Sequence, residues 1–362
     1  MRMRTGRKAA AFVAVLALTV AACGNGGDDA PEDTAAPDEA PDDGADDDPA
    51  DAPEDTEDEP EVGEGDPDVL NLGYILPETG DLAFLGPPMI SGTQMAVEEI
   101  NEAGGVLGND VELLSGDEAN DTGMAAEEAS RLMAAGVDAI IGAAATGMTM
   151  AIIDMVTGAG VVQCSPSNTG PGLTTYDDGG FYFRTAPTDA LQGPVIAERV
   201  IGDGHTTLAV AGRGDDYGQG LLEATVETFE AQGGEVVYAD TYDPNAATFD
   251  SVVEDLVNSG ADAYVLVSFA EGGAIVQGLL AAGTETSQMY GADGIAGHDF
   301  IDEVDPSNPN ALDGMTFTSP STQSTSDFDQ KLTDFAPDIS DRLFAPQSYD
   351  CVNLFALAAE AA

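Results

Sequence analysis

The chain has 362 residues, of which 67 are acidic and 10 are lysine or arginine, so its formal net charge at pH 7 is −57. This balance excludes nucleic acid as a partner, because binding to phosphates needs a basic surface, and it disfavours adsorption to an anionic membrane. Since salt screens the self-repulsion of so many carboxylates, the composition predicts a salt-adapted, halophilic source.

The N-terminus predicts an extracytoplasmic protein. A basic segment, MRMRTGRK, precedes an apolar run over residues 9–20, and Ala21, Ala22 and Cys23 follow. This order is typical of a secretory signal, and its end resembles the lipobox of bacterial lipoproteins. The resemblance implies cleavage after residue 22 and a lipid on Cys23 that anchors the protein to the cell membrane. An ordinary signal peptide with an incidental cysteine is the alternative.

Residues 23–68 are expected to form a disordered acidic tether. Residues 24–68 contain 21 acidic side chains, no basic one and no aromatic one. Such a segment buries too little apolar surface to offset the entropy of ordering the chain. The remaining residues, 69–362, carry a formal charge of about −40.

From residue 69 onward, apolar strands alternate with amphipathic helices. Strands are predicted over residues 69–76, 111–114, 139–141 and 161–164, and helices over residues 90–103, 122–135 and 149–157. After residue 187 the alternation starts again. The second block has predicted strands over residues 207–211, 235–241, 263–269 and 289–291, and helices over residues 191–201, 220–231, 249–258 and 272–282. A last helix is predicted over residues 349–362, where the chain stops without a cap.

This alternation predicts an α/β fold with two doubly wound parallel-sheet lobes joined by a hinge. The expected lobe boundaries are residues 69–186 for the first lobe, 187–316 for the second, and 317–362 for a return to the first lobe that is truncated at its end. Ligands of open parallel sheets bind at the carboxyl ends of the strands. A two-lobed protein would therefore hold its ligand in the cleft between the lobes.

Several motifs resemble those of a known family in their order and spacing. They are Thr79-Gly80, residues 94–101 (QMAVEEIN), residues 165–171 (SPSNTGP), residues 183–187 (FRTAP), Tyr217-Gly218, residues 291–294 (GADG) and Tyr349-Asp350. The chain is similar over nearly all of residues 69–362 to the substrate-binding lipoproteins of branched-chain amino acid ABC transporters, the leucine/isoleucine/valine-binding type of the type I periplasmic-binding-protein fold. The family usually continues beyond residue 362, which supports a truncated chain.

The resemblance implies positions for the ligand contacts. Thr146 would meet the ligand carboxylate at the start of a helix, where free N–H groups favour an anion; its capping of that helix is the alternative. The main-chain groups of the turn formed by Ser167, Asn168 and Thr169, together with the Thr169 hydroxyl, would contact both the carboxylate and the amino group. Asp293 would pair with the ammonium. The remaining lining positions are Tyr217, which would close over the ligand, Phe269, and Leu85, where the family often has an aromatic residue.

The implied function is capture of a branched-chain or related amino acid and its delivery to an ABC transporter permease by a monomer that needs no cofactor and makes or breaks no bond. A sensor of amides or urea with the same fold remains an alternative, as does, from another class, a secreted α/β hydrolase. Glu271 is expected to be a solvated loop acid rather than part of the cleft wall. His205 and His298 lack metal-ligand spacing, so no metal site is expected.

Two cysteines, Cys164 and Cys351, remain after Cys23. In an extracytoplasmic protein two cysteines invite a disulfide, and the family layout implies that both belong to the first lobe. Two buried free thiols are the alternative, because nothing marks Cys164 as a reactive thiolate.

Overall fold

The computed structural model describes residues 62–63, 65–320 and 324–362. The predicted signal peptide, Cys23 and most of the predicted tether lie outside the described residues.

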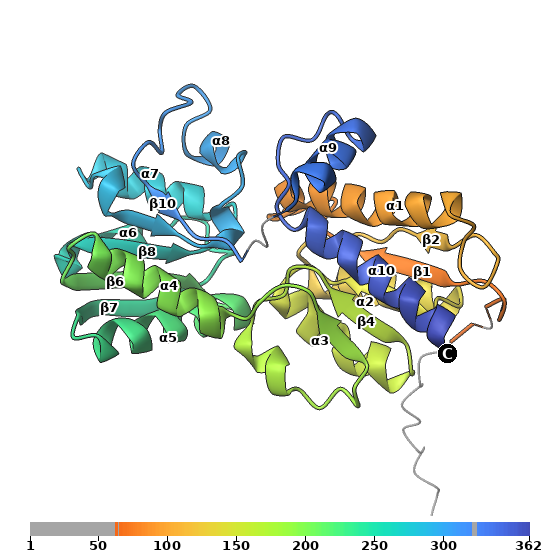
Figure 1. Cartoon of the computed structure of the whole chain (residues 1–362). Helices are drawn as coiled ribbons and strands as arrows, with labels where there is room; N and C mark the ends of the chain where they lie inside the picture. Colours follow the sequence, from red (N-terminus) through yellow and green to blue (C-terminus); the bar gives the residue numbers. More distant parts are fainter. Residues whose placement is uncertain (1–61, 64, 321–323) are drawn as a thin grey trace, which may run out of the picture. The chain divides into compact units, whose positions relative to one another are not determined.

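The first half of the chain builds one sheet with its helices (Figure 1). Its elements are β1 (Asn71–Ile75), η1 (Ala83–Leu85), α1 (Gly86–Glu102), β2 (Glu112–Leu114), α2 (Thr122–Ala134), β3 (Ala139–Gly142), α3 (Thr146–Gly158), β4 (Val162–Ser165), η2 (Pro171–Thr175) and β5 (Tyr182–Arg184). The strand order is β2-β1-β3-β4-β5, and every neighbouring pair is parallel.

The second half builds another five-stranded sheet. Its elements are α4 (Asp189–Gly202), β6 (Thr207–Arg213), α5 (Asp216–Ala231), β7 (Glu235–Tyr242), α6 (Asp250–Ser259), β8 (Ala263–Val267), α7 (Gly272–Ala281), η3 (Thr286–Gln288), β9 (Met289–Gly291), η4 (Asp293–Ile295), α8 (Phe300–Val304) and β10 (Thr316–Phe317). This sheet has the order β10-β9-β8-β6-β7 and is also parallel throughout. The two parallel-sheet lobes confirm the predicted fold class.

The central strands are buried because helices cover both faces of each sheet. All four residues of β3 and all five of β8 are buried, as expected for parallel strands that read as continuous apolar runs. In β7, at the edge of the second sheet, exposed and half-buried residues alternate over the first five positions. Strands buried on both faces are continuous apolar runs in the sequence, and these runs made the central strands predictable.

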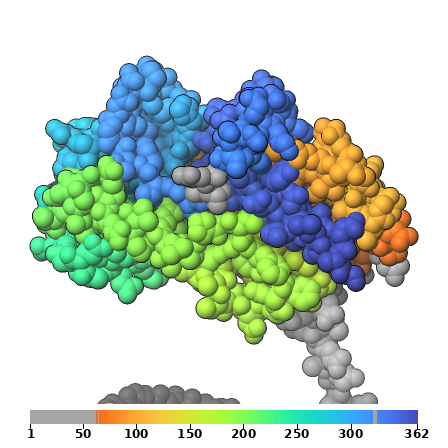
Figure 2. Space-filling model, in the orientation of Figure 1, coloured from red at the N-terminus to blue at the C-terminus, as the bar shows by residue number. Residues whose placement is uncertain are grey.

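After β10 the chain returns to the first lobe through α9 (Ser326–Phe335) and α10 (Ala345–Ala361). Helix α10 packs against α1 and against β3 and β4. The face shown in Figure 2 has α10, in blue, at its surface. One side of α10 buries Cys351, Val352 and Phe355, while Leu354 and Leu357 on its other side are 52% and 68% exposed.

Several helices start earlier than the apolar pattern predicted. Helix α5 begins at Asp216 rather than at residue 220, because the Asp215 side chain accepts a hydrogen bond from the Gly218 N–H and caps the first turn. Helix α1 begins at Gly86 rather than at residue 90, and its two prolines lie in the first turn, where a missing N–H costs no helical hydrogen bond. Both shifts bring the helix N-termini closer to the strand ends. Among the described residues, no helix has the length and apolar character needed to cross a membrane.

Candidate functional site

The carboxyl ends of strands from both sheets contribute to one small cavity. From the first lobe come the segment after β3, the turn after β4, η1 with the residue before it, and Phe344 before α10; from the second come the start of α5 and the segments after β8 and β9. Its volume is about 20 Å³, and it is lined by Leu82, Leu85, Ala144, Ala145, Thr146, Ser167, Thr169, Tyr217, Phe269, Asp293, Gly294 and Phe344. A cavity of that size holds about one water molecule, so the lobes must separate before an amino acid can enter.

The cavity brings together seven of the eight predicted contact residues, and Asn168 is the exception. The Asn168 side chain donates a hydrogen bond from Nδ2 to the Ala144 carbonyl oxygen at 2.7 Å and accepts one at Oδ1 from the Tyr182 hydroxyl at 2.8 Å. Both ends of this amide are therefore occupied within the first lobe. The Asn168 side chain therefore holds the turn between Ser167 and Thr169 in place, and the expected contact of the turn's main-chain groups with the ligand stays a prediction.

One end of the cavity is the N-terminus of α3. The N-cap is Ala145, which has no side-chain cap, and Thr146 is the first helical residue. The Thr146 hydroxyl oxygen accepts a hydrogen bond from the Gly170 N–H at 3.2 Å, so the alternative that Thr146 caps its own helix is wrong. Its hydroxyl proton remains able to donate. Together with the positive end of the helix dipole, this hydroxyl suits a ligand carboxylate.

A buried acid that the sequence did not single out lies beneath this helix N-terminus. The Glu118 carboxylate accepts hydrogen bonds from the N–H groups of Ala144 at 2.6 Å and Ala145 at 3.2 Å. Burial raises the pKa of the Glu118 carboxyl to about 8, although these two hydrogen bonds act to lower it. Glu118 thus fixes the segment that carries Thr146. Nothing in the local sequence distinguishes it from the many exposed acids nearby.

The other end of the cavity carries a carboxylate held by two donors. Asp293 Oδ1 accepts hydrogen bonds from Gln192 Nε2 at 2.9 Å and from the Tyr217 hydroxyl at 2.9 Å. The Tyr217 hydroxyl oxygen in turn accepts from the Gly294 N–H at 3.1 Å. Burial raises the pKa of the Asp293 carboxyl, while the donors Tyr217 and Gln192 act to lower it. A cation entering the cavity would stabilise the ionised form of this acid.

An aromatic stack forms the wall beside Asp293. The rings of Tyr217 and Phe269 are stacked with their centroids 5.2 Å apart, and the Arg213 guanidinium lies 3.7 Å from the Phe269 centroid. Arg213 Nη1 also donates a hydrogen bond to Glu271 at 2.9 Å. The charges of Arg213 and Glu271 therefore balance one another on the far side of the aromatic wall. Arg213 does not line the small cavity.

The expectation for Glu271 is wrong. Its side chain is 9% exposed and accepts hydrogen bonds from Arg213 and from the Tyr242 hydroxyl, the latter at 2.9 Å. A solvated loop acid would make neither contact. Sequence reasoning could not foresee this ion pair, because Arg213 and Glu271 follow different strands and meet only through the sheet order.

Two wider cavities adjoin the small one. The first, of about 420 Å³, shares Thr146 with it and is bounded by η2 and α5. The second, of about 650 Å³, shares Ala145 and has in its lining four acids, Asp81, Asp121, Asp215 and Asp216, and one cation, Arg213, which pairs with Asp215. These acids give one approach to the site a negative potential, which repels anions and attracts cations.

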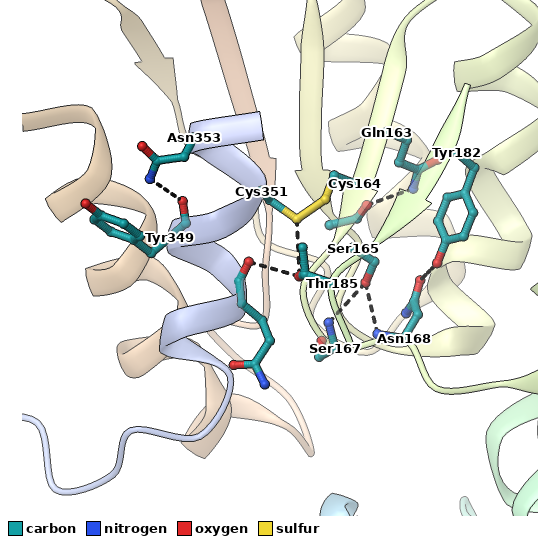
Figure 3. Close-up of a disulfide and its surroundings, with 12 residues drawn as sticks. Gln163, Cys164, Ser165, Ser167, Asn168, Tyr182, Thr185, Tyr349, Cys351 and Asn353 are labelled. Atoms are coloured by element: carbon teal, nitrogen blue, oxygen red, sulfur yellow. Dashed lines mark hydrogen bonds between the residues drawn. A yellow bond between two sulfur atoms is a disulfide. The ribbon is translucent and has the colours of Figure 1, made fainter. Parts of the chain in front are cut away.

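A disulfide bond connects α10 to the end of β4, from which the turn with Ser167 and Thr169 starts. Cys164 of β4 and Cys351 of α10 form a disulfide bond with their Cα atoms 5.9 Å apart (Figure 3). The Thr185 hydroxyl donates to the Gln347 carbonyl oxygen of α10 at 2.9 Å beside it. Because Cys164 directly precedes Ser165, whose hydroxyl accepts from the Asn168 N–H at 3.0 Å, the bond braces the strand end from which the turn starts.

The comparison with protein families agrees with this geometry. A family model described as "Periplasmic binding protein" matches residues 69–362. The chain belongs to the periplasmic binding protein family. The family consists of substrate-binding proteins and implies an extracytoplasmic location, and the match confirms the resemblance found in the sequence.

Relatives within this family are named for branched-chain amino acids. The Leu/Ile/Val-binding protein homolog 3 of Brucella melitensis is 29% identical over 233 residues, which are 64% of this chain and 63% of that protein; the match thus covers less than two thirds of the relative. The leucine-, isoleucine-, valine-, threonine- and alanine-binding protein of Pseudomonas aeruginosa is 28% identical over 260 residues, covering 70% of this chain and 67% of its own.

A solved structure supports the same family. The branched-chain amino acid transporter substrate binding protein LivJ from Streptococcus pneumoniae, solved in complex with isoleucine, superposes with a TM-score of 0.71 at 28% identity and covers 81% of this chain and 84% of its own. The substrate-binding protein from Desulfitobacterium hafniense in complex with Leu has a TM-score of 0.63 at 24% identity, with coverages of 81% and 84%. At that identity the second likeness supports the fold alone.

Proposed function

We propose that this protein captures a branched-chain or related amino acid in the cavity between its lobes and delivers it to the permease of an ABC transporter. One observation carries the proposal: a group that suits an anion and a group that suits a cation lie at opposite ends of the same buried cavity. The α3 N-terminus with Thr146 suits a carboxylate, and Asp293 with Tyr217 suits an ammonium. An α-amino acid presents these two groups on a single carbon.

The remaining walls fit an aliphatic side chain. Leu82, Leu85 and Phe344 are buried apolar residues of the first lobe that line the same cavity, and Phe269 adds an aromatic ring from the second. Closure of the lobes over the ligand would remove these surfaces from water together, which favours the closed form. The names of the relatives from Brucella and Pseudomonas support this side-chain class.

The proposed membrane anchor and monomeric state are inferred from the sequence. A lipid on Cys23 would anchor the chain to the cell membrane, and residues 24–68 would tether the lobes at a distance from it. The protein would act as a monomer. The segment between β5 and α4 would serve as part of the hinge, because the chain passes from one sheet to the other there.

A thermal-shift panel tests the ligand class. A ligand at about one hundred times its Kd adds about 2.7 kcal/mol of stability, which for about 294 folded residues raises Tm by about 4 °C. We expect this rise with leucine, isoleucine or valine and no rise with acetamide or urea. An amide sensor would give the reverse pattern, because an amide has no ammonium to pair with Asp293, and that result would overturn the proposal.

A further inference from the structure

Asp189 is a buried carboxyl without a hydrogen-bond partner. It is the first residue of α4, its exposed fraction is 0%, and neither carboxyl oxygen has a partner among the described residues. Burial makes the ionised form of this group costly, although the Thr169 hydroxyl and the charge of Arg184 act to lower the pKa of Asp189. The predicted site contacts do not include Asp189.

Two contacts place Asp189 beside the ammonium end of the cavity. Its backbone N–H donates a hydrogen bond to the Thr169 carbonyl oxygen at 2.7 Å, and Thr169 lines the cavity. Gln192, three residues later on the same face of α4, donates from Nε2 to Asp293 Oδ1 at 2.9 Å. The first turn of α4 therefore contacts Thr169 through the backbone of Asp189 and Asp293 through the side chain of Gln192, and Asp189 itself does not line the cavity.

The neighbouring elements supply little positive charge to this pair. Tyr217 of α5 faces both acids, and burial together with their charges raises its pKa well above the usual value, so it stays neutral. The charge of Arg184 of β5 acts to lower the pKa of Asp189, but its guanidinium donates hydrogen bonds to the Gly170 carbonyl oxygen at 2.8 Å and to the Thr174 hydroxyl at 2.5 Å and not to Asp189. The other nearby cation, Arg213, is paired with Glu271 and Asp215.

Two buried carboxyls that repel one another and have no cation paired directly with either do not both ionise near neutral pH. Burial raises the pKa of both acids, and the negative charge of Asp293 raises the pKa of Asp189 further. The protons then belong to the pair rather than to either residue. A ligand ammonium supplies the missing positive charge and changes this balance.

We propose that Asp189 and Asp293 share one proton in the protein without ligand and release it when a ligand ammonium enters the cavity. This inference rests on the proposed function, since it concerns the same site. In the step, the carboxyl O–H bond of the pair breaks, its proton passes to the buffer, and both carboxylates remain ionised beside the R–NH3+ group. No electron is transferred. The association constant then rises with pH, by up to tenfold per pH unit, until the pair is fully ionised.

Calorimetry counts the released proton. Leucine is titrated into the full chain at pH 7 in phosphate and in Tris, whose ionisation enthalpies differ, and the difference in observed heat gives the number of protons released. We expect close to one proton for the wild type and close to none for Asp189→Asn, which keeps the shape of the protonated acid. The matched control is Asp250→Asn, at the exposed first position of α6 and away from the cavities, which should release the same number as the wild type.

Binding without proton release by the wild type, or equal release by Asp189→Asn, would overturn the inference while leaving the proposed function intact. Absence of any binding heat would contradict the proposed function instead. In that case the pair is tested without ligand, by NMR titration of 13C-labelled aspartate carboxyls in the wild type. A carboxyl that stays protonated near neutral pH is expected, and ionisation of every aspartate below about pH 5, close to the usual range, would overturn the inference.

Discussion

Replacing Asp293 with alanine is expected to weaken leucine binding by at least about 100-fold. The substitution removes the one carboxylate that lines the cavity, so the ligand ammonium keeps only the more distant charge of Asp189. Breaking a buried charge pair in this way costs about 3–5 kcal/mol. The Tyr217 hydroxyl and Gln192 Nε2 also lose the oxygen to which both donate. Isothermal titration calorimetry of the wild type and the variant measures the ratio of the two Kd values.

The effect should fall mainly on binding. Without ligand, the loss of the acceptor for Tyr217 and Gln192 costs about 1–3 kcal/mol, partly offset because Asp293 is a buried acid whose ionised form is disfavoured by burial, so Tm should fall by no more than about 5 °C. Asp299→Ala is the matched control, because Asp299 is exposed and follows Asp293 closely in the chain. Retained affinity in Asp293→Ala, or an equal loss in Asp299→Ala, would remove Asp293 from the proposed site.

Loss of the disulfide between Cys164 and Cys351 should cost about 5 kcal/mol of stability. The bond closes a loop of 187 residues, and in the chain-entropy model a loop of that length restricts the unfolded state by about this amount. For about 294 folded residues the Tm should fall by about 8 °C. Thermal unfolding of the Cys164→Ala/Cys351→Ala double variant measures the change.

Thiol titration supplies the control for this experiment. In a Cys23→Ser background, the unfolded and unreduced protein should have no reactive thiol, and reduction should release two. Each single variant should lose about as much stability as the double variant, because either one breaks the bond. Two reactive thiols before reduction, or a double variant as stable as the parent, would contradict a disulfide in the folded protein.

The sequence predicted the strands better than the boundaries of the helices. The apolar runs of β3 and β8 are buried on both faces and so are visible without tertiary information. Helix α5 starts four residues before its predicted first residue, because the Asp215 cap and not an apolar side chain defines its first turn. Strand β10 has two residues and exists only through its pairing with β9, so no local pattern could predict it.

Some residues of the candidate site were predicted from the sequence and others were not. Thr146, Thr169 and Asp293 were predicted because their surrounding motifs resemble a known family, and the structure brings all three to one cavity. Glu118 and Asp189 were not predicted, although both are fully buried beside that cavity. In residues 69–362, where 46 side chains are acidic, only tertiary contacts distinguish a buried carboxyl from a solvated one.

A crystal structure of the protein with bound leucine tests the central claim most directly. The account predicts that the ligand lies in the cavity between the lobes, with its ammonium within hydrogen-bond distance of the Asp293 carboxylate and its carboxylate at the N-terminus of α3 beside the Thr146 hydroxyl. It would be contradicted by leucine bound in the wider cavity between η2 and α5, or by leucine in the small cavity with its ammonium turned away from Asp293.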